Sequence, residues 1–291
     1  MKKNILLIMA LILVTSCKTD QSKNQQINAS DKENSYYGFN PPGMTPELFA
    51  PGIVSTDNLE VLGSFSPNLD EFYFKRQLKG EPSKNIGIRL ENGKWIQFME
   101  EPNSGEIAIA PDNTKMYLGN KYRERTASGW SEPKSLGELY EEIPIMRLTA
   151  SKIGTYVFDE RDSIGTIRIS KLNDGIREEP EEIGEVFSSG TYISHPFIAP
   201  DESYIIWDFV HEDGYGDSDL YISFRQEDDS WGPAINMGED INSEFEDIYG
   251  SVTSDGKYFI FHRIDLGATY DESSANVYWV DAETIWRLKN N

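Results

Sequence analysis

Residues 254–261, SDGKYFIF, join four turn-forming or polar residues to four large apolar ones. A polar turn that leads directly into a buried strand has this pattern. The pattern recurs without gaps at PNLDEFYF (67–74), PDNTKMYL (111–118), SKIGTYVF (151–158) and PDESYIIW (200–207). Successive copies are 44, 40, 49 and 54 residues apart. This spacing indicates one supersecondary unit that is repeated five times.

Each repeat carries signals for further strands on both sides of the turn. A short apolar segment precedes the turn, such as GSFS before Pro67 and GSVT before Ser254. After the first copy, residues 86–90 lead through Asn92-Gly93 to Trp95, and the third copy likewise leads through Asp174-Gly175 to Ile176. After the fourth copy, residues 220–224 lead to a fourth strand at Trp231. Asn-Gly and Asp-Gly supply the positive φ that hairpin turns need. Four antiparallel strands in about 45 residues are typical of a propeller blade.

The last repeat has no candidate for its fourth strand. Residues 277–280 supply a third strand, and the final residues DAETIWRLKNN predict a short helix. Near the N-terminus, Phe49-Ala50-Pro51 resembles Trp231-Gly232-Pro233, so we expect residues 47–55 to donate the missing strand. Such closure of the ring leaves no long exposed sheet edge.

We therefore predict an all-β fold, a β-propeller of five four-stranded blades whose ring is closed by an N-terminal strand. Six blades are the alternative, if the long stretch between Trp207 and Ser254 contains an extra irregular unit. Trp95, Trp130 and Trp231 recur at one repeat position, which favours packing between blades.

The N-terminus predicts export and lipidation. Lys2 and Lys3 precede an apolar run, residues 5–14, that is too short to span a bilayer. The following Val14-Thr15-Ser16-Cys17 resembles a bacterial lipobox, in which the cysteine thiol is lipidated. We expect a signal peptide over residues 1–16 and a lipid on Cys17. An ordinary signal peptide with an incidental cysteine is the alternative.

The rest of the chain divides into a tether and one domain. Residues 17–35 are polar and contain no aromatic residue, so they cannot bury enough apolar surface to offset the entropy of ordering. We expect a lipidated flexible tether over residues 17–35 and a single propeller domain over residues 36–291. Because Cys17 is the only cysteine, no internal disulfide can form.

The charge balance is strongly acidic. The chain has 27 Lys and Arg against 49 Asp and Glu, a formal net charge of −22. Such a surface repels polyanions, so we expect no nucleic-acid partner. An acidic surface that keeps the protein soluble is the simplest interpretation, and recruitment of cations or basic partners is the alternative. We expect a monomer that contacts the membrane through its lipid alone.

The repeats at Pro67, Pro111, Pro200 and Ser254 resemble the WD40-like repeat (PD40) of TolB-type propellers, whose typical form is SPDGKxIxF. The copy at Ser151 departs from it, because it lacks both the Pro and the Asp. The resemblance covers roughly residues 36–285 and extends to exported bacterial lipoproteins built from this repeat. It implies a propeller fold and protein binding in the cell envelope. Because propellers host unrelated activities, it implies little about chemistry.

Different polar residues follow the second strand of each repeat. Equivalent positions in successive blades cluster at one end of a propeller, so these residues predict a polar binding pocket. Ordinary pairing between blades is the alternative. The binding candidates are Arg76, Asp159, Arg161, Asp208, His211, His262 and Arg263.

A glycan-cleaving enzyme must also be considered, since some five-bladed propellers hydrolyse glycans. Hydrolysis needs two carboxyl groups that face each other across a sugar. Asp159 and Asp208 are the candidates for that pair. With 49 acidic residues in the chain, however, carboxylates near the centre of the ring are expected by chance.

A glycine-bent acidic loop gives weak candidates for calcium ligands. Asp213, Asp217 and Asp219 lie at spacings of four and two, but the loop lacks the remaining ligands of an EF-hand. An acidic turn in which Asp219 accepts hydrogen bonds from backbone amides is favoured over a metal site. His195, His211 and His262 lie far apart in the sequence, and His195 is expected to be a packed or hydrogen-bonded element. We predict no cofactor.

The sequence thus predicts an exported, lipid-anchored propeller that binds a protein or a glycan in the cell envelope, periplasmic or on the cell surface, without catalysis. The alternative is a glycoside hydrolase or polysaccharide lyase.

Overall fold

The computed structural model describes residues 36, 38–162, 164–188, 190–269 and 272–290. The predicted signal peptide, the predicted lipidation site Cys17 and the predicted tether lie outside the described residues. Among the residues that are described, no helix is long and apolar enough to cross a lipid bilayer.

The described strands fall into consecutive groups in which neighbours in sequence pair antiparallel. The first group is β2 (Leu59–Phe65), β3 (Glu71–Gln77), β4 (Lys84–Glu91) and β5 (Lys94–Pro102). The second is β6 (Ile107–Ile109), β7 (Lys115–Leu118), β8 (Lys121–Thr126) and β10 (Lys134–Ser135), with β9 (Gly129–Trp130) beside β8. The third is β11 (Ile145–Ala150), β12 (Tyr156–Glu160), β13 (Ile167–Ser170) and β16 (Glu181–Glu182).

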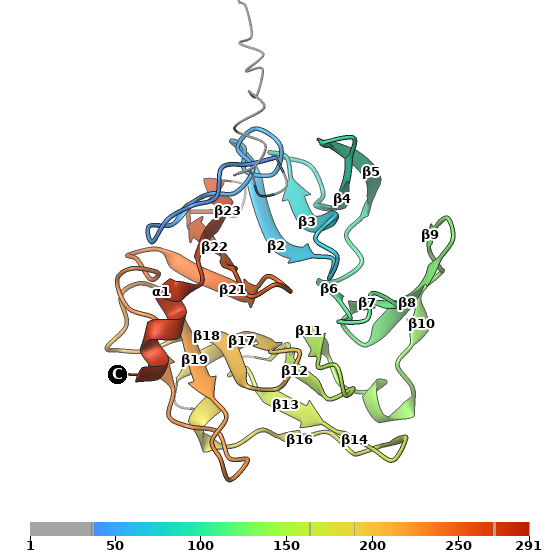
Figure 1. The fold of residues 1–291 in the computed structure, drawn as a ribbon, viewed down its shortest axis with the longest axis vertical. Helices are drawn as coiled ribbons and strands as arrows, with labels where there is room; N and C mark the ends of the chain where they lie inside the picture. Colours follow the sequence, from blue (N-terminus) through green and yellow to red (C-terminus); the bar gives the residue numbers. More distant parts are fainter. Residues whose placement is uncertain (1–35, 37, 163, 189, 270–271, 291) are drawn as a thin grey trace, which may run out of the picture. The chain divides into compact units, whose positions relative to one another are not determined.

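The fourth group is β17 (Thr191–Ile198), β18 (Tyr204–Val210), β19 (Asp219–Phe224) and β20 (Ile235–Asn236), and the fifth is β21 (Glu246–Val252), β22 (Tyr258–Asp265), β23 (Ser274–Asp281) and β1 (Glu47–Leu48). Each group holds one copy of the repeat, whose turn joins the first strand to the second. Figure 1 shows the groups arranged in a ring with β2, β6, β11, β17 and β21 nearest the centre. The predicted all-β propeller fold is therefore confirmed.

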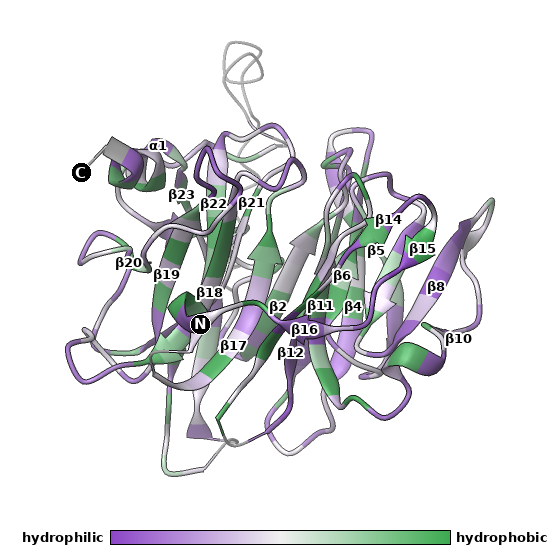
Figure 2. Cartoon of the chain, turned by 90° about the horizontal axis from the view of Figure 1, so that it is seen from below, coloured by the Kyte–Doolittle hydropathy of each residue, from purple (hydrophilic) through white to green (hydrophobic). Residues whose placement is uncertain are grey.

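The strands carry the apolar residues of the domain. Figure 2 shows hydrophobic residues concentrated along the strands, whereas the loops are mostly hydrophilic. In the second strands the repeat's apolar residues are almost completely buried, as in residues 72–74, 205–207 and 259–261. Strands that are covered on both faces read as continuous apolar runs. This explains why the repeat shows a block of large residues rather than an alternating pattern.

The ring closes between the first and last groups. Glu47 pairs with Trp279 and Leu48 with Tyr278, so β1 is the fourth strand of the last group. β2 also pairs with β23 in parallel at Leu59 and Ala275. The donated N-terminal strand was predicted, and the structure confirms it with a ladder of only two residues. The chain then ends in the helix α1 (Glu283–Trp286) and a 3₁₀ turn (Arg287–Asn290), as the sequence predicts.

The fourth strands of the third and fourth groups were placed too early in the sequence. Ile176 lies in a separate hairpin, β14 (Leu172–Asn173) with β15 (Ile176–Arg177), and the strand that pairs with β13 is β16. Trp231 makes only an isolated bridge to Arg225, and β20 supplies the fourth strand. The hairpin turn was correct, because Asp174 and Gly175 both have positive φ. After this hairpin the chain returns to the sheet of the third group as β16, which pairs with β13.

Two of the recurring tryptophans pack between groups, as predicted. Trp130 of the second group donates a hydrogen bond from Nε1 to the Tyr73 hydroxyl of the first, over 3.0 Å. Trp231 of the fourth group packs against Phe187, which lies at the end of the third, at 6.1 Å between ring centroids.

Phe49 connects the donated strand to the aromatic core. It is 1% exposed, and its ring centroid lies 4.8 Å from that of Phe72 and 5.4 Å from that of Trp279. It therefore contacts the first and the last group at once.

We predict that Phe49→Ala lowers the free energy of unfolding by about 3–5 kcal/mol, since a buried aromatic side chain is lost and a cavity remains. Leu48→Ala is the matched control. Leu48 is the neighbouring residue but is 39% exposed, so its loss should change stability by about 0.5 kcal/mol or less. Urea denaturation followed by fluorescence measures both. Equal effects of the two substitutions would show that Phe49 does not close the ring.

Candidate functional site

The first strands of four groups carry bulges near the centre of the ring. The register with the second strand shifts between residues 61 and 64 in β2, 145 and 148 in β11, 194 and 197 in β17, and 248 and 251 in β21. Residues in a bulge leave the ladder, so their backbone N–H groups need other acceptors.

Two aspartates of the second strands supply such acceptors across group boundaries. Asp159 accepts the N–H of Arg147 in its own group at 2.7 Å and that of His195 in the fourth group at 2.8 Å. Asp208 accepts the N–H of Tyr249 in the fifth group at 3.2 Å. Both carboxyl groups are almost completely buried. They therefore hold neighbouring groups together and are not available to a ligand at the surface.

His262 takes the same role where the ring closes. Its Nδ1 lies 2.8 Å from the backbone nitrogen of Leu62, and its Nε2 lies 2.9 Å from that of Gly63. A neutral imidazole has one acceptor nitrogen and a charged one has none. His262 thus links the fifth group to the first only when its ring is uncharged.

These three residues lie inside strands, although the sequence placed them just beyond strand ends. The second strands continue to Glu160, Val210 and Asp265, past the apolar block of the repeat. The common repeat position was correctly identified. The sequence left two interpretations of this position open, a polar binding pocket and pairing between blades. For Asp159, Asp208 and His262 the structure shows pairing between blades.

Arg76 and Arg263 occupy equivalent positions in ion pairs. The Arg76 Nε lies 2.7 Å from the Glu60 carboxylate, and the Arg263 Nε lies 2.8 Å from that of Asp247. Both carboxylates are fully buried, and each arginine also donates to a backbone carbonyl, that of Ile53 or Ile241. These contacts assign the two arginines to the stability of their sheets.

The two remaining binding candidates lie in loops. Arg161 is exposed and lines a cavity of about 490 Å³ together with Lys75, Glu106 and Asn120. His211 accepts the backbone N–H of Asp213 at 3.1 Å. The structure therefore does not bring the seven candidates together in one pocket.

The acidic loop is organised by backbone hydrogen bonds. Asp219 accepts the N–H groups of Tyr215 at 2.7 Å and Gly216 at 3.3 Å, and the Asn236 side chain donates to it at 3.0 Å. This is the turn that the sequence favoured over a calcium site. In the described part of the chain, no group of three His, Cys, Asp or Glu side chains is arranged to hold a metal ion.

Sequence reasoning missed a buried polar cluster beneath the centre of the ring. His195 Nδ1 lies 2.9 Å from Asp208 Oδ1, and its ring packs on Tyr249 at 3.7 Å between centroids. The guanidinium carbon of Arg147 lies 5.0 Å from the same tyrosine ring. Glu106 is 8% exposed, and its Oε2 has no hydrogen-bond partner.

Burial dominates the electrostatics of this cluster because it penalises every charged form. It raises the pKa of Glu106, Asp159 and Asp208 above the ordinary carboxyl value. It lowers the pKa of His195, and that of His262 falls well below the usual histidine value. Near neutral pH both imidazoles are therefore neutral, as hydrogen bonding by His262 requires.

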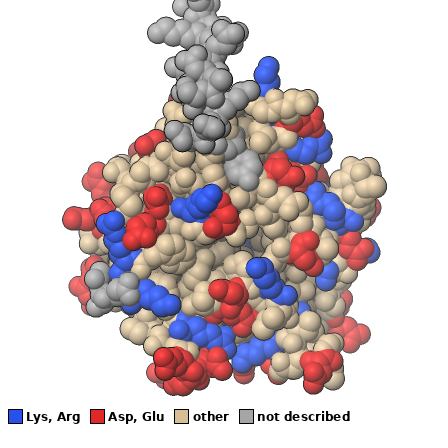
Figure 3. All heavy atoms as spheres, viewed as in Figure 1, with Lys and Arg blue, Asp and Glu red and all other residues tan. Residues whose placement is uncertain are grey.

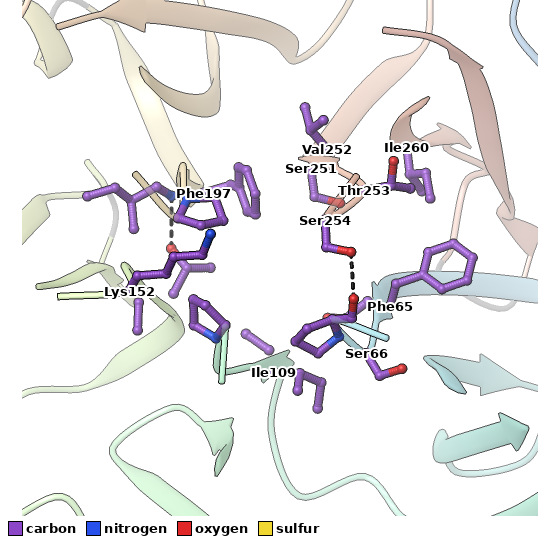
Figure 4. Close-up of a pocket in the computed structure, with 18 of the residues that line it drawn as sticks. Phe65, Ser66, Ile109, Lys152, Phe197, Ser251, Val252, Thr253, Ser254 and Ile260 are labelled. Carbon is purple, nitrogen blue, oxygen red and sulfur yellow. Dashed lines mark hydrogen bonds between the residues drawn. The ribbon is translucent and has the colours of Figure 1, made fainter. Parts of the chain in front are cut away.

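A cavity of about 360 Å³ opens at the end of the ring where the repeat turns lie. Its lining comes from the first strands and turns of all groups, and Figure 4 shows Lys152 and Ser254 on opposite sides of it. Figure 3 shows charges of both signs over the same face of the domain. The cavity itself, however, has neither Asp, Glu nor His among its described lining residues. It offers hydrogen bonds and positive charge, without a carboxyl pair for acid–base chemistry.

Aligning the repeats would have found part of this site. Five positions before each repeat begins stand Leu62, Glu106, Met146, His195 and Tyr249, and three of these polar or aromatic residues form the buried cluster. The predicted binding residues all come from the position after the second strand. Contact between Tyr249 and two histidines 67 residues apart in sequence required the closed ring.

Comparisons with known proteins give fold-level similarity. Neither a family model nor a curated protein matches the sequence. Solved structures that are similar to this chain include a TolB and two glycoside hydrolases. TolB from Acinetobacter baumannii aligns with a TM-score of 0.45 and 9% identity over 77% of this chain. The alignment covers 57% of that TolB chain, so this chain spans less than two thirds of its length.

The GH43 endo-arabinanase from Bacillus licheniformis aligns with a TM-score of 0.45 and 12% identity, over 78% of this chain and 94% of that one. The α-L-arabinofuranosidase PaAbf62A from Podospora anserina aligns with a TM-score of 0.45 and 9% identity, over 82% and 97%. At these scores the assignment of a site rests on the residues of this chain.

We predict that His262→Phe lowers the free energy of unfolding at pH 7 by about 1–3 kcal/mol, because a buried N–H group loses its acceptor. The wild-type histidine has a lowered pKa in the folded state. Its contribution is therefore fully present above the unfolded pKa, near 6.5, and is lost as pH falls below it. Between pH 7 and 5 the wild type should lose stability more steeply than His262→Phe, by up to about 1.4 kcal/mol per pH unit.

His211→Gln is the control for this experiment, because His211 lies in a loop with 32% of its side chain exposed. It should follow the wild-type pH profile in urea denaturation. Parallel pH profiles for His262→Phe and the wild type would contradict the proposed role of His262.

Proposed function

We propose that this protein is a non-enzymatic binding module of the cell envelope, which holds part of a glycan or protein ligand in the 360 Å³ cavity at the turn end of the ring. The observation that carries the proposal is the composition of that cavity. Pockets that bind small ligands have volumes of about 300–1,000 Å³ and combine apolar walls with a few polar groups. This cavity has that character and lacks a carboxyl pair.

Glycan cleavage finds less support in the geometry. Hydrolysis requires two carboxyl groups that reach the sugar. Asp159 and Asp208 are buried and accept backbone N–H groups of neighbouring strands. Glu106 is the one acidic residue among the described residues that line the cavity at the opposite end. Binding is therefore the better-supported function.

The binding proposal predicts that Ser251→Tyr weakens ligand affinity at least about 10-fold, because the larger side chain occupies part of a small-ligand cavity. Ligands would be found by glycan array and by binding to defined envelope proteins, and affinities measured by calorimetry. Ser128→Tyr is the control, since Ser128 is exposed in the turn before β9 and does not line this cavity.

Unchanged affinity in Ser251→Tyr would overturn the assignment of the cavity. Turnover of a bound oligosaccharide that is lost in Asp208→Asn would favour the glycan-cleaving alternative instead.

We further propose that the protein is exported and lipid-anchored through Cys17. The basic residues, short apolar run and small residues before Cys17 support this proposal. A lipid-modified cysteine and a polar tether would hold the propeller near a membrane without a spanning segment.

Cys17→Ser should move the protein from the membrane fraction to the soluble fraction, because the thiol that carries the lipid is absent. Fractionation and immunoblotting of cells that express each form measure the shift. Continued membrane association of Cys17→Ser would contradict the lipid anchor.

A further inference from the structure

The central cavity at the turn end is positively charged in a strongly acidic protein. The chain carries a formal net charge of −22. Of the described residues that line the cavity, two are cationic, Arg147 and Lys152, and none is acidic. A local excess of one charge in a concave site concentrates ligands of the opposite charge.

Arg147 is a buried cation that forms no ion pair with any residue the structure describes. The residue is 2% exposed, and its Nε makes no hydrogen bond. Among the described residues, no Asp or Glu oxygen lies within 4.0 Å of its guanidinium nitrogens. Its guanidinium carbon lies over the face of the Tyr249 ring, 5.0 Å from the ring centroid. Buried charges in proteins are normally paired, so this guanidinium has unused capacity for an anion.

The nearby carboxyl groups of Asp159 and Glu106 do not form an ion pair with the Arg147 guanidinium. Asp159 accepts two backbone N–H groups, one of them that of Arg147 itself. Glu106 lies close enough for Arg147 to lower its pKa, but burial outweighs this and the pKa remains raised.

Lys152 replaces an acidic residue of the repeat. At the second position of the repeat, Asp112, Asp201 and Asp255 each accept a backbone N–H of their own turn. The third repeat has Lys152 there, and its side chain lies at the cavity, where Figure 4 shows it. The substitution gives up a turn-stabilising contact and adds a positive charge to the site.

Arg147 is exceptional at its own repeat position too. The equivalent residues, four before the start of each repeat, are Gly63, Ile107, Pro196 and Gly250. Both cations thus come from the third repeat, which is also the copy that departs from the consensus. A ring of similar units with two cations on one of them has the form of a binding site added to a scaffold.

Two serine hydroxyl groups of the lining can also contact a ligand. Ser64 and Ser251 occupy equivalent positions in the first and fifth groups, and their side chains make no hydrogen bond to other described residues. A hydroxyl both donates and accepts, so it suits the hydroxyl groups of a sugar.

We propose that the cavity binds the carboxylate of an acidic sugar unit, such as a uronic acid within a glycan, with Arg147 on the carboxylate, Lys152 at the rim and the two serines on sugar hydroxyls. This inference rests on the proposed binding function and names the ligand class of the same cavity. An arginine can bind a carboxylate through two parallel hydrogen bonds, which favours a carboxylate over a neutral group.

The test compares oligosaccharides that differ only in the carboxyl group, namely oligogalacturonate and the matching galactose oligomer, by calorimetry on the purified chain. We expect the acidic oligomer to bind at least about 10-fold more tightly, as charge-assisted hydrogen bonds imply. Arg147→Met should reduce its affinity by about 10- to 100-fold. Lys152→Gln should reduce it by about 2- to 5-fold, because the rim charge is solvated.

Lys257→Gln is the matched control. Lys257 is an exposed lysine of the equivalent turn in the fifth repeat and does not line the cavity, so its affinity should equal that of the wild type. Thermal unfolding checks that each variant is folded. Because Lys152 is exposed, Lys152→Gln keeps the test informative if Arg147→Met does not fold.

Equal binding of the neutral and acidic oligomers, still blocked by Ser251→Tyr, would overturn the acidic-sugar inference and leave the proposed binding function intact. So would binding of a peptide through its C-terminal carboxylate without binding of any uronate. Acidic binding that persists in Ser251→Tyr, or in both cation variants, would overturn the cavity assignment itself.

Discussion

The structure depends on the need to satisfy backbone N–H groups at the bulges of the inner strands. A propeller blade must curve and twist toward the centre of the ring, and a bulge allows this at the cost of leaving amides outside the ladder. An unpaired buried amide costs about 1–3 kcal/mol. Asp159, Asp208 and His262 accept these amides from the next group, so the same contacts that complete each strand also join the ring.

This constraint decides which polar residues remain for function. Polar side chains on the second strands, such as Asp208 and His262, form hydrogen bonds with neighbouring strands, and their burial favours the neutral forms of these side chains. At the turn end of the ring, Asp112 and Asp201 stabilise their own turns locally. Single hydrogen bonds there also join neighbouring groups, such as Lys152 N–H to the Pro200 carbonyl and the Ser254 hydroxyl to the Pro67 carbonyl. Arg147 and Lys152, both in the third repeat, lie at the cavity of that end.

Much of the fold was predictable because its signals are local and repeated. Turn residues followed by a block of large apolar residues fixed the first two strands of every group, and resemblance of residues 49–51 to 231–233 indicated the donated strand. The fourth strands of the third and fourth groups were misplaced, since pairing of β16 and β20 depends on where the chain returns after the third strand. The candidate site was predicted less well. A polar residue's position in a repeat does not tell whether it faces solvent or the next strand.

The sequence by itself determined the repeat, the all-β class, the closure by an N-terminal strand and the acidic charge, because each follows from a local sequence pattern or from the composition. Only the tertiary structure decided that His262 meets Leu62 and Gly63, 199 to 200 residues away. It also decided that Arg147 is buried without a carboxylate partner in the described part of the chain. These facts arise where strands from different repeats converge on the centre of the ring. Burial and pairing there are properties of the assembled strands, and no single repeat contains both partners.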